Sequence, residues 1–249
     1  MPPPFRQVNR AQFAQILEQF RFTRRVTSVH FHHTSTPNHA QFRGHDSVVG
    51  MFRHHTQTRG FRDIAQHLTL APDGSIFICR NWNLPPASSV GVNGTTHAGP
   101  FMFETVGNFN VGSDPFTDPQ RRTVLAVIAL VQRKFRLPST ALHFHREFAN
   151  TDCPGSSLRK SEIIAAVEQL GANPNADAAD PLSAESLQAD LSVEEAARDE
   201  AFELKQVLRE METTEQAGDG VSREGWVEED THDAPAEEVA EPSDVPRRD

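Results

Sequence analysis

Apolar residues recur at helical spacing in four stretches of the first 170 residues. The clearest stripe follows Asp118-Pro119, which makes a good cap and first turn. It places Val124, Val127, Ile128, Val131 and Phe135 on one face. The other three predicted helices cover residues 9–20, 46–58 and 161–170. The chain of 249 residues is long enough to bury a sizeable core.

Shorter apolar stretches between these helices are typical of strands. We expect strands at residues 26–32, 101–106 and 141–145, and a hairpin of residues 63–70 and 75–80 around an Asp-Gly turn. Residues 81–100, rich in Asn, Pro, Gly and Ser, predict a loop. Because helices and strands mix without strict alternation, an α/β or α+β fold with a single sheet follows.

The chain changes character after residue 170. Residues 1–170 hold 18 lysines and arginines against 11 aspartates and glutamates, a net of +7, whereas residues 171–249 hold 6 against 23, a net of −17. We therefore predict a mildly basic globular domain at 1–170. The acidic extension at 171–249 is expected to contain a linker, a weak helical stripe and a disordered tail.

Composition excludes several classes of protein. No apolar run approaches the roughly 18 residues of a membrane helix, so no membrane span is expected. Two cysteines, Cys79 and Cys153, form at most one bridge, or one of them takes part in chemistry. A basic domain favours polyanions, either nucleic acid or an anionic cell wall. Its scattered basic residues and the acidic extension argue against nucleic acid as a partner.

Candidate metal ligands lie at the ends of predicted strands. His32 ends the first strand, His145 ends the strand at 141–145, and Cys153 follows eight residues later. Imidazole and thiolate suit Zn²⁺, and three protein ligands with an open position define a catalytic zinc site. By spacing alone the metal site is only suggested, since a single histidine at a strand end is more often an ordinary core or surface residue.

An ordered set of motifs sharpens this picture. In sequence order they are His32-His33-Thr34, Asp63-Ile64, Thr96-His97-Ala98-Gly99, Glu104-Thr105-Val106-Gly107-Asn108 and Thr151-Asp152-Cys153-Pro154-Gly155. Over residues 26–170 the set resembles the zinc-dependent N-acetylmuramoyl-L-alanine amidase family, whose fold is shared with peptidoglycan recognition proteins and phage amidase endolysins. The resemblance implies a single mixed central β-sheet flanked by helices.

Carried over residue by residue, the resemblance places the Zn²⁺ ligands on His32, His145 and Cys153. His30 and His143 share strand parity with the two histidine ligands, and either becomes the ligand if the register is displaced. His33 points to the other face of an ideal strand and is expected to serve in packing or to support a ligand.

The resemblance also implies three residues that act on the substrate. Glu104 is the expected general base, or else a solvent-facing carboxylate. Thr151 is expected to stabilise the transition state, or else to satisfy a turn. His97 is expected to hydrogen-bond the substrate or the oxyanion, or else to have no role. One departure stands out: Gln66 occupies the place where many family members have a Tyr.

The implied reaction is hydrolysis of the amide between N-acetylmuramic acid and L-alanine in peptidoglycan or soluble muropeptides, by a chain expected to be a monomer. The alternative is a non-catalytic module that binds peptidoglycan; the presence of Cys153 favours the enzyme, and Gln66 keeps the alternative open. The N-terminus lacks a secretory signal, so we expect a chain that is cytoplasmic as synthesised, with export or phage-type release as further routes.

Overall fold

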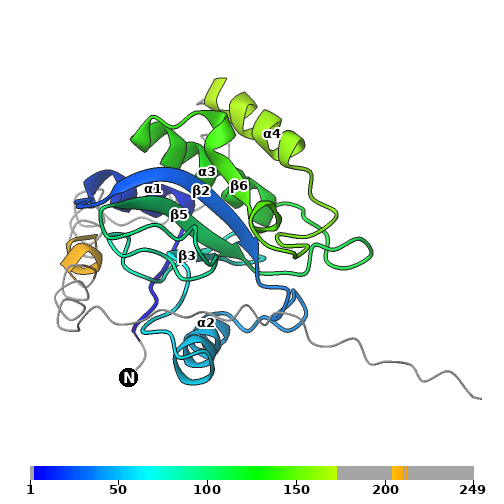
Figure 1. Cartoon of the computed structure of the whole chain (residues 1–249), viewed down its shortest axis with the longest axis horizontal. Coiled ribbons are helices and arrows are strands. Elements are labelled where there is room, and N and C mark those ends of the chain that lie inside the picture. Colours follow the sequence, from blue (N-terminus) through cyan, green and yellow to red (C-terminus); the bar gives the residue numbers. More distant parts are fainter. Residues whose placement is uncertain (1–2, 173–203, 210, 212–249) are drawn as a thin grey trace, which may run out of the picture.

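The computed structural model describes residues 3–172, 204–209 and 211 (Figure 1). Four helices, six strands and short turns are arranged along residues 3–172. They are β1 (Gln7–Val8), α1 (Arg10–Gln19), β2 (Arg25–His33), α2 (His45–Arg53), a π-helical turn (His54–Thr58), β3 (Leu68–Leu70), β4 (Ile76–Ile78), β5 (Ala98–Thr105), α3 (Gln120–Phe135), a 3₁₀ turn (Ser139–Ala141), β6 (Leu142–Phe144), a second 3₁₀ turn (His145–Glu147) and α4 (Lys160–Ala172).

The six strands form one mixed sheet in the order β1-β4-β3-β5-β2-β6. Strands β3, β5, β2 and β6 are parallel to one another, while β4 pairs antiparallel with both β3 and β1. Because the four parallel strands run the same way, their carboxyl ends meet at one edge of the sheet. The expected class, a single mixed central sheet flanked by helices, is confirmed.

The two faces of the sheet have different chemistry because successive side chains on a strand point to opposite sides. One face carries the large apolar residues of β2 and β5, such as Phe31 and Phe103, which pack beneath α1, α3 and α4 in the main core. The other face carries His30, His32 and Glu104. Helix α2 lies on this second side, opposite α3 and α4 (Figure 1). The polar face is therefore only partly covered.

Most predicted elements are present, and the differences lie at their ends. The helix expected at 46–58 is α-helical only to Arg53 and continues as the π-helical turn. The first hairpin strand shortens to β3, and β5 begins at Ala98, three residues before the expected start. Strand β1, only two residues long, was not predicted. It forms because its backbone pairs with β4. The sequence around β1 carries no pattern that would predict this long-range pairing.

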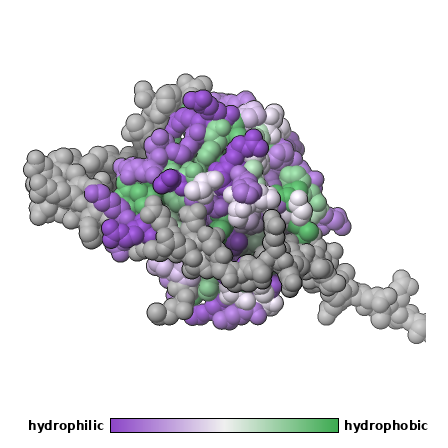
Figure 2. Space-filling model, turned by 60° about the vertical axis from the view of Figure 1, so that its left-hand side comes forward, coloured by the Kyte–Doolittle hydropathy of each residue, from purple (hydrophilic) through white to green (hydrophobic). Residues whose placement is uncertain are grey.

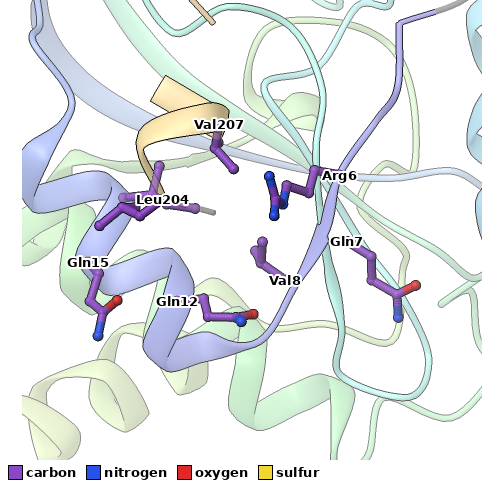
Figure 3. A pocket seen from close by; sticks show the side chains of 8 residues that line it. Arg6, Gln7, Val8, Gln12, Gln15, Leu204 and Val207 are labelled. Carbon is purple, nitrogen blue, oxygen red and sulfur yellow. The ribbon is translucent and has the colours of Figure 1, made fainter. Parts of the chain in front are cut away.

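A helix at residues 204–209 packs against the amino-terminal part of the fold (Figure 3). Val207 and Met211 are 3% and 7% exposed and belong to the same core cluster as Val8 and Ile16. The side-chain amide of Asn81 donates a hydrogen bond to the carbonyl oxygen of Met211. The acidic extension thus contributes apolar residues to the core, whereas the predicted linker and tail lie outside the described residues.

The visible surface of the described residues carries mainly hydrophilic side chains, with hydrophobic ones in separate patches (Figure 2). Within the described residues, none of the helices combines the length and the apolar character needed to cross a bilayer.

Candidate metal centre

Three potential ligands converge at the edge where the parallel strands end. His32 is the penultimate residue of β2, and His145 follows directly after the adjacent parallel strand β6. Cys153 reaches the same point from the following loop. One ligand atom from each residue lies within 4.8 Å of the other two, and the Cys153 Sγ lies 3.7 Å from the His32 Nδ1. Only 3%, 9% and 7% of His32, His145 and Cys153 are exposed.

Neighbouring groups fix the orientation of these ligands. The backbone N–H of His33 donates to the Cys153 Sγ at 3.4 Å. The Ser89 hydroxyl lies 3.4 Å from the His32 Nε2, which leaves Nδ1 facing the thiol. The backbone N–H of Arg146 donates to the Cys153 carbonyl oxygen at 3.0 Å, which ties the cysteine turn to His145. Such contacts hold ligand rings and thiols in place before an ion binds.

The protonation of the three groups suits a divalent cation. Burial holds the pKa of His32 well below its usual value, and the nearby His145 lowers it further. The His32 imidazole is therefore neutral and has a free lone pair. Burial raises the pKa of the Cys153 thiol to about 12. A bound cation would offset this cost and favour the thiolate. Two imidazoles and one thiolate match the ligands that Zn²⁺ prefers, and three protein ligands leave a fourth position open.

Glu104 lies beside this centre. It occupies β5 directly opposite His32 in parallel register, so both side chains project from the same face. Among the described residues no group hydrogen-bonds its carboxylate, and burial raises its pKa to about 7. A carboxylate with that pKa is suited to take up and release a proton near neutral pH.

Thr151 lies at the start of the turn that presents Cys153. Its hydroxyl accepts the backbone N–H of Cys153 at 3.2 Å, which is the turn role that the sequence left open. The hydroxyl proton has no acceptor among the described residues, so it is still available to a ligand. The same hydroxyl can therefore satisfy the turn and donate its proton to a ligand.

The structure does not bring His97 to the centre. His97 is exposed and immediately precedes β5, while Glu104 is near the other end of that strand. Seven extended residues separate the two by roughly 20 Å. His97 lies at the opposite edge of the sheet because it precedes the strand whose carboxyl end carries Glu104. This position does not support a bond to an oxyanion at the centre, and the expected hydrogen bond of His97 to the substrate stays a prediction.

The alternative ligands also lie outside the cluster. The His30 ring packs against the rings of His143 and Phe148, with centroids 5.8 and 5.1 Å away. The His143 Nδ1 pairs with Glu147 at 3.0 Å. His33 accepts the backbone N–H of Phe109 at its Nδ1, at 3.2 Å, so its ring holds the neighbouring loop.

Gln66 is fully buried below the polar face. Its Nε2 donates to the Thr69 hydroxyl at 2.9 Å, while its Oε1 has no partner among the described residues. Thr69 is the β3 neighbour of Glu104. Ser89 was not identified from the sequence, because it reaches His32 across 57 residues from a loop without a recognisable motif.

The three clustered residues could hold a metal ion and would leave a fourth coordination position open. Sequence comparison adds the family: a model described as N-acetylmuramoyl-L-alanine amidase matches residues 22–156, more than half of the chain. The chain belongs to the N-acetylmuramoyl-L-alanine amidase family. All three clustered residues and Glu104 lie within the matched range.

The chain is similar to a human member of this family over part of its length. The human N-acetylmuramoyl-L-alanine amidase is 30% identical over 114 residues, which cover 45% of this chain and 19% of the human protein. The chain therefore spans about a fifth of the length of that curated relative.

Several solved structures match part of this chain. The N-acetylmuramoyl-L-alanine amidase LysC from Clostridium intestinale is 26% identical, with a TM-score of 0.47 over 59% of this chain and 87% of LysC. Drosophila PGRP-LB is 23% identical, with a TM-score of 0.48 over 57% and 81% of the two chains. A PGRP-LB mutant in complex with tracheal cytotoxin is 24% identical, with a TM-score of 0.47 over 57% and 82%.

Proposed function

We propose that the chain is a zinc-dependent hydrolase that cleaves the amide between the lactyl group of N-acetylmuramic acid and L-alanine, in peptidoglycan or in soluble muropeptides. The observation that carries this proposal is the convergence of His32, His145 and Cys153 within 4.8 Å, with Glu104 beside them on the same face. Membership of the amidase family supports this bond as the target.

His32, His145 and Cys153 would hold the ion. Zinc bound by such a set activates a water molecule and polarises the amide carbonyl. Glu104 takes the proton from the attacking water and then delivers it to the leaving nitrogen of L-alanine. Water adds to the carbonyl carbon and the carbon–nitrogen bond breaks, which yields a lactyl carboxylate and a free amine. The Thr151 hydroxyl donates to the carbonyl oxygen as negative charge develops there.

Metal content and activity, measured together, test this proposal. Wild-type protein is expected to hold about one zinc per chain and to release free stem peptide from muropeptides. Cys153→Ala is expected to lose both. Cys79→Ala is the matched control, because the Cys79 Sγ contacts Thr69 and Phe77 instead of the ligand cluster. This control is expected to keep both.

The possible outcomes are distinct. A freshly purified wild-type protein without zinc, prepared without chelator, would overturn the ligand assignment and the mechanism. Zinc that depends on Cys153 but brings no cleavage would favour a recognition module. Gln66, which stands where many family members have a Tyr, is the specific observation behind that second function, because an amide side chain cannot act as a base near neutral pH.

A further inference from the structure

Arg146 connects two of the candidate metal ligands, and the mechanism above gives it no role. It follows His145 directly in the chain, and its backbone N–H donates to the carbonyl oxygen of Cys153 at 3.0 Å. Its guanidinium donates to three further carbonyl oxygens around the cysteine turn (residues 152–158), those of Asp152, Gly155 and Leu158. One residue therefore holds the turn on both sides of the thiol.

The guanidinium of Arg146 is supported from its other side by the core. Its Cζ lies 4.8 Å from the centroid of the Phe144 ring, a distance at which a guanidinium stacks on an aromatic face. Phe144 is buried, and its ring packs against that of Phe31 in β2, with centroids 5.4 Å apart. Because His32 follows Phe31 in β2, these contacts fix the cysteine turn relative to the strand that carries the third ligand.

The chemistry of these contacts requires an arginine. The distance from Nη1 is 2.8 Å to the Gly155 carbonyl oxygen and 3.4 Å to that of Asp152, while Nη2 donates to Leu158. A guanidinium presents its donors in a rigid planar fork, whereas a lysine ammonium is a single point of charge on a flexible stem. Hydrogen bonds from a charged donor are also the stronger kind. The fork can therefore bind carbonyl groups from separate points of the turn at once.

No carboxylate competes for this guanidinium within the described part of the chain. The ion pairs found there involve other cations, including Arg159, which pairs with Glu162 at the surface. The donors of Arg146 instead go to backbone carbonyl groups. Contacts of this kind, from a residue that does not itself bind the ion, orient metal ligands in proteins.

We propose that Arg146 is a positioning residue for Cys153: its fork clamps the carbonyl groups of the cysteine turn and so holds the thiol beside His32 and His145 before an ion binds. Arg146 would act through Cys153 and would touch neither the ion nor the substrate. A turn that is already ordered loses less conformational entropy when the ion binds, so the clamp raises metal affinity. The inference rests on the proposed function, because it takes Cys153 to be a zinc ligand.

Zinc affinity, measured by chelator competition on the full chain, is the first test. Arg146→Met keeps an unbranched side chain against Phe144 but has no donors, and it is expected to weaken zinc binding by about 10- to 100-fold. Arg146→Lys keeps the charge without the fork and is expected to weaken it by about threefold or more. Arg159→Met is the matched control. It removes a surface ion pair and is expected to change zinc affinity by less than about twofold.

Cobalt distinguishes a misplaced thiol from a protein that is merely less stable. Co²⁺ bound by a thiolate absorbs in the near ultraviolet through charge transfer from sulfur to the metal. The band is measured at saturating Co²⁺, where circular dichroism shows each variant to be folded. It is expected at full strength in the wild type and in Arg159→Met, weakened in Arg146→Met and absent from Cys153→Ala. A side chain needed for stability alone would lower the free energy of unfolding and leave the band unchanged.

The outcomes separate this inference from the proposed function. Wild-type zinc affinity and an unchanged cobalt band in Arg146→Met would overturn the clamp, and so would full recovery of zinc affinity by Arg146→Lys. Zinc binding that depends on Arg146, in a wild type that cleaves nothing, would support the clamp and count against the hydrolase. A wild type that binds no zinc would overturn both.

Discussion

The carboxyl group of Glu104 should govern the pH dependence of activity. Burial raises its pKa to about 7, and the proposed base acts only when it is deprotonated. Below its pKa the group is protonated, so log kcat on a soluble muropeptide is expected to rise with a slope near one and to level off once the carboxylate has formed. The active protein holds zinc, and a nearby cation favours the carboxylate, so this limb is expected below pH 7.

Glu104→Gln provides the control for this pH profile. A carboxamide cannot accept the proton, so kcat is expected to fall by about 10²- to 10⁴-fold and the rising limb to disappear. Zinc content should stay at the wild-type value, because Glu104 is not among the clustered ligand residues. A variant that keeps the same limb would assign the titration to another group and remove Glu104 from its role.

At the scale of residues, the predictable part of the site is the part set by strand register. His32 and His145 could be placed together because each ends a predicted strand, and the strand ends meet at one edge. Glu104 came from the family resemblance, and the parallel register of β2 and β5 then explains why it lies beside His32. His97 was carried over from the resemblance alone, and the structure places it before β5, at the edge opposite Glu104. Ser89 shows the same limit: a loop contact across 57 residues has no local pattern.

Among the elements, the turn that presents Cys153 depends on a glycine. Gly155 has a φ of +126°, and a Cβ added there would collide with the Phe109 carbonyl. Gly155→Ala should therefore push apart the cysteine turn and the loop around Phe109. We expect a loss of at least about 1 kcal/mol in the free energy of unfolding and a clear fall in zinc affinity, measured by denaturant titration and chelator competition.

Gly60→Ala separates the collision from backbone strain. Gly60 also has a positive φ, +71°, but a Cβ there would meet nothing within 4 Å. This variant is expected to lose about 1 kcal/mol from strain while it keeps the zinc affinity of the wild type. If both variants bound zinc equally well, contact between the two loops would not position Cys153.

Helices and strands could be predicted where their own apolar residues follow a helical or a strand-like spacing. Helix α3 and strand β2 have clear apolar patterns, and both lie where the sequence placed them. Strand β1 has two residues and exists only through its pairing with β4. The helix expected at 46–58 keeps its position but changes to π-helical hydrogen bonding after Arg53, a change that helical spacing alone does not reveal.

At the scale of the whole molecule, apolar side chains decide which part of the acidic extension packs against the core. The helical stripe that the sequence indicated is present at residues 204–209, but its contact with the core joins residues about 200 positions apart. Charge pointed to a separate appendage, whereas Val207 and Met211 place this segment in the main core. Net charge describes solubility and partners, while apolar side chains decide packing.

Two truncations measure what this segment contributes. A chain ending at Met211 keeps the docked helix, while a chain ending at Ala172 exposes the side chains of Val8 and Ile16 that it covers. Burying Val207 and Met211 is worth about 1.5–3 kcal/mol each, offset in part by the entropy of ordering the helix. The shorter chain is therefore expected to unfold with about 2–4 kcal/mol less free energy than the longer one in urea, and the longer one to match the full chain. Equal stability of the two truncated chains would show that the helix contributes nothing to the fold and would restore a domain that ends at the close of α4.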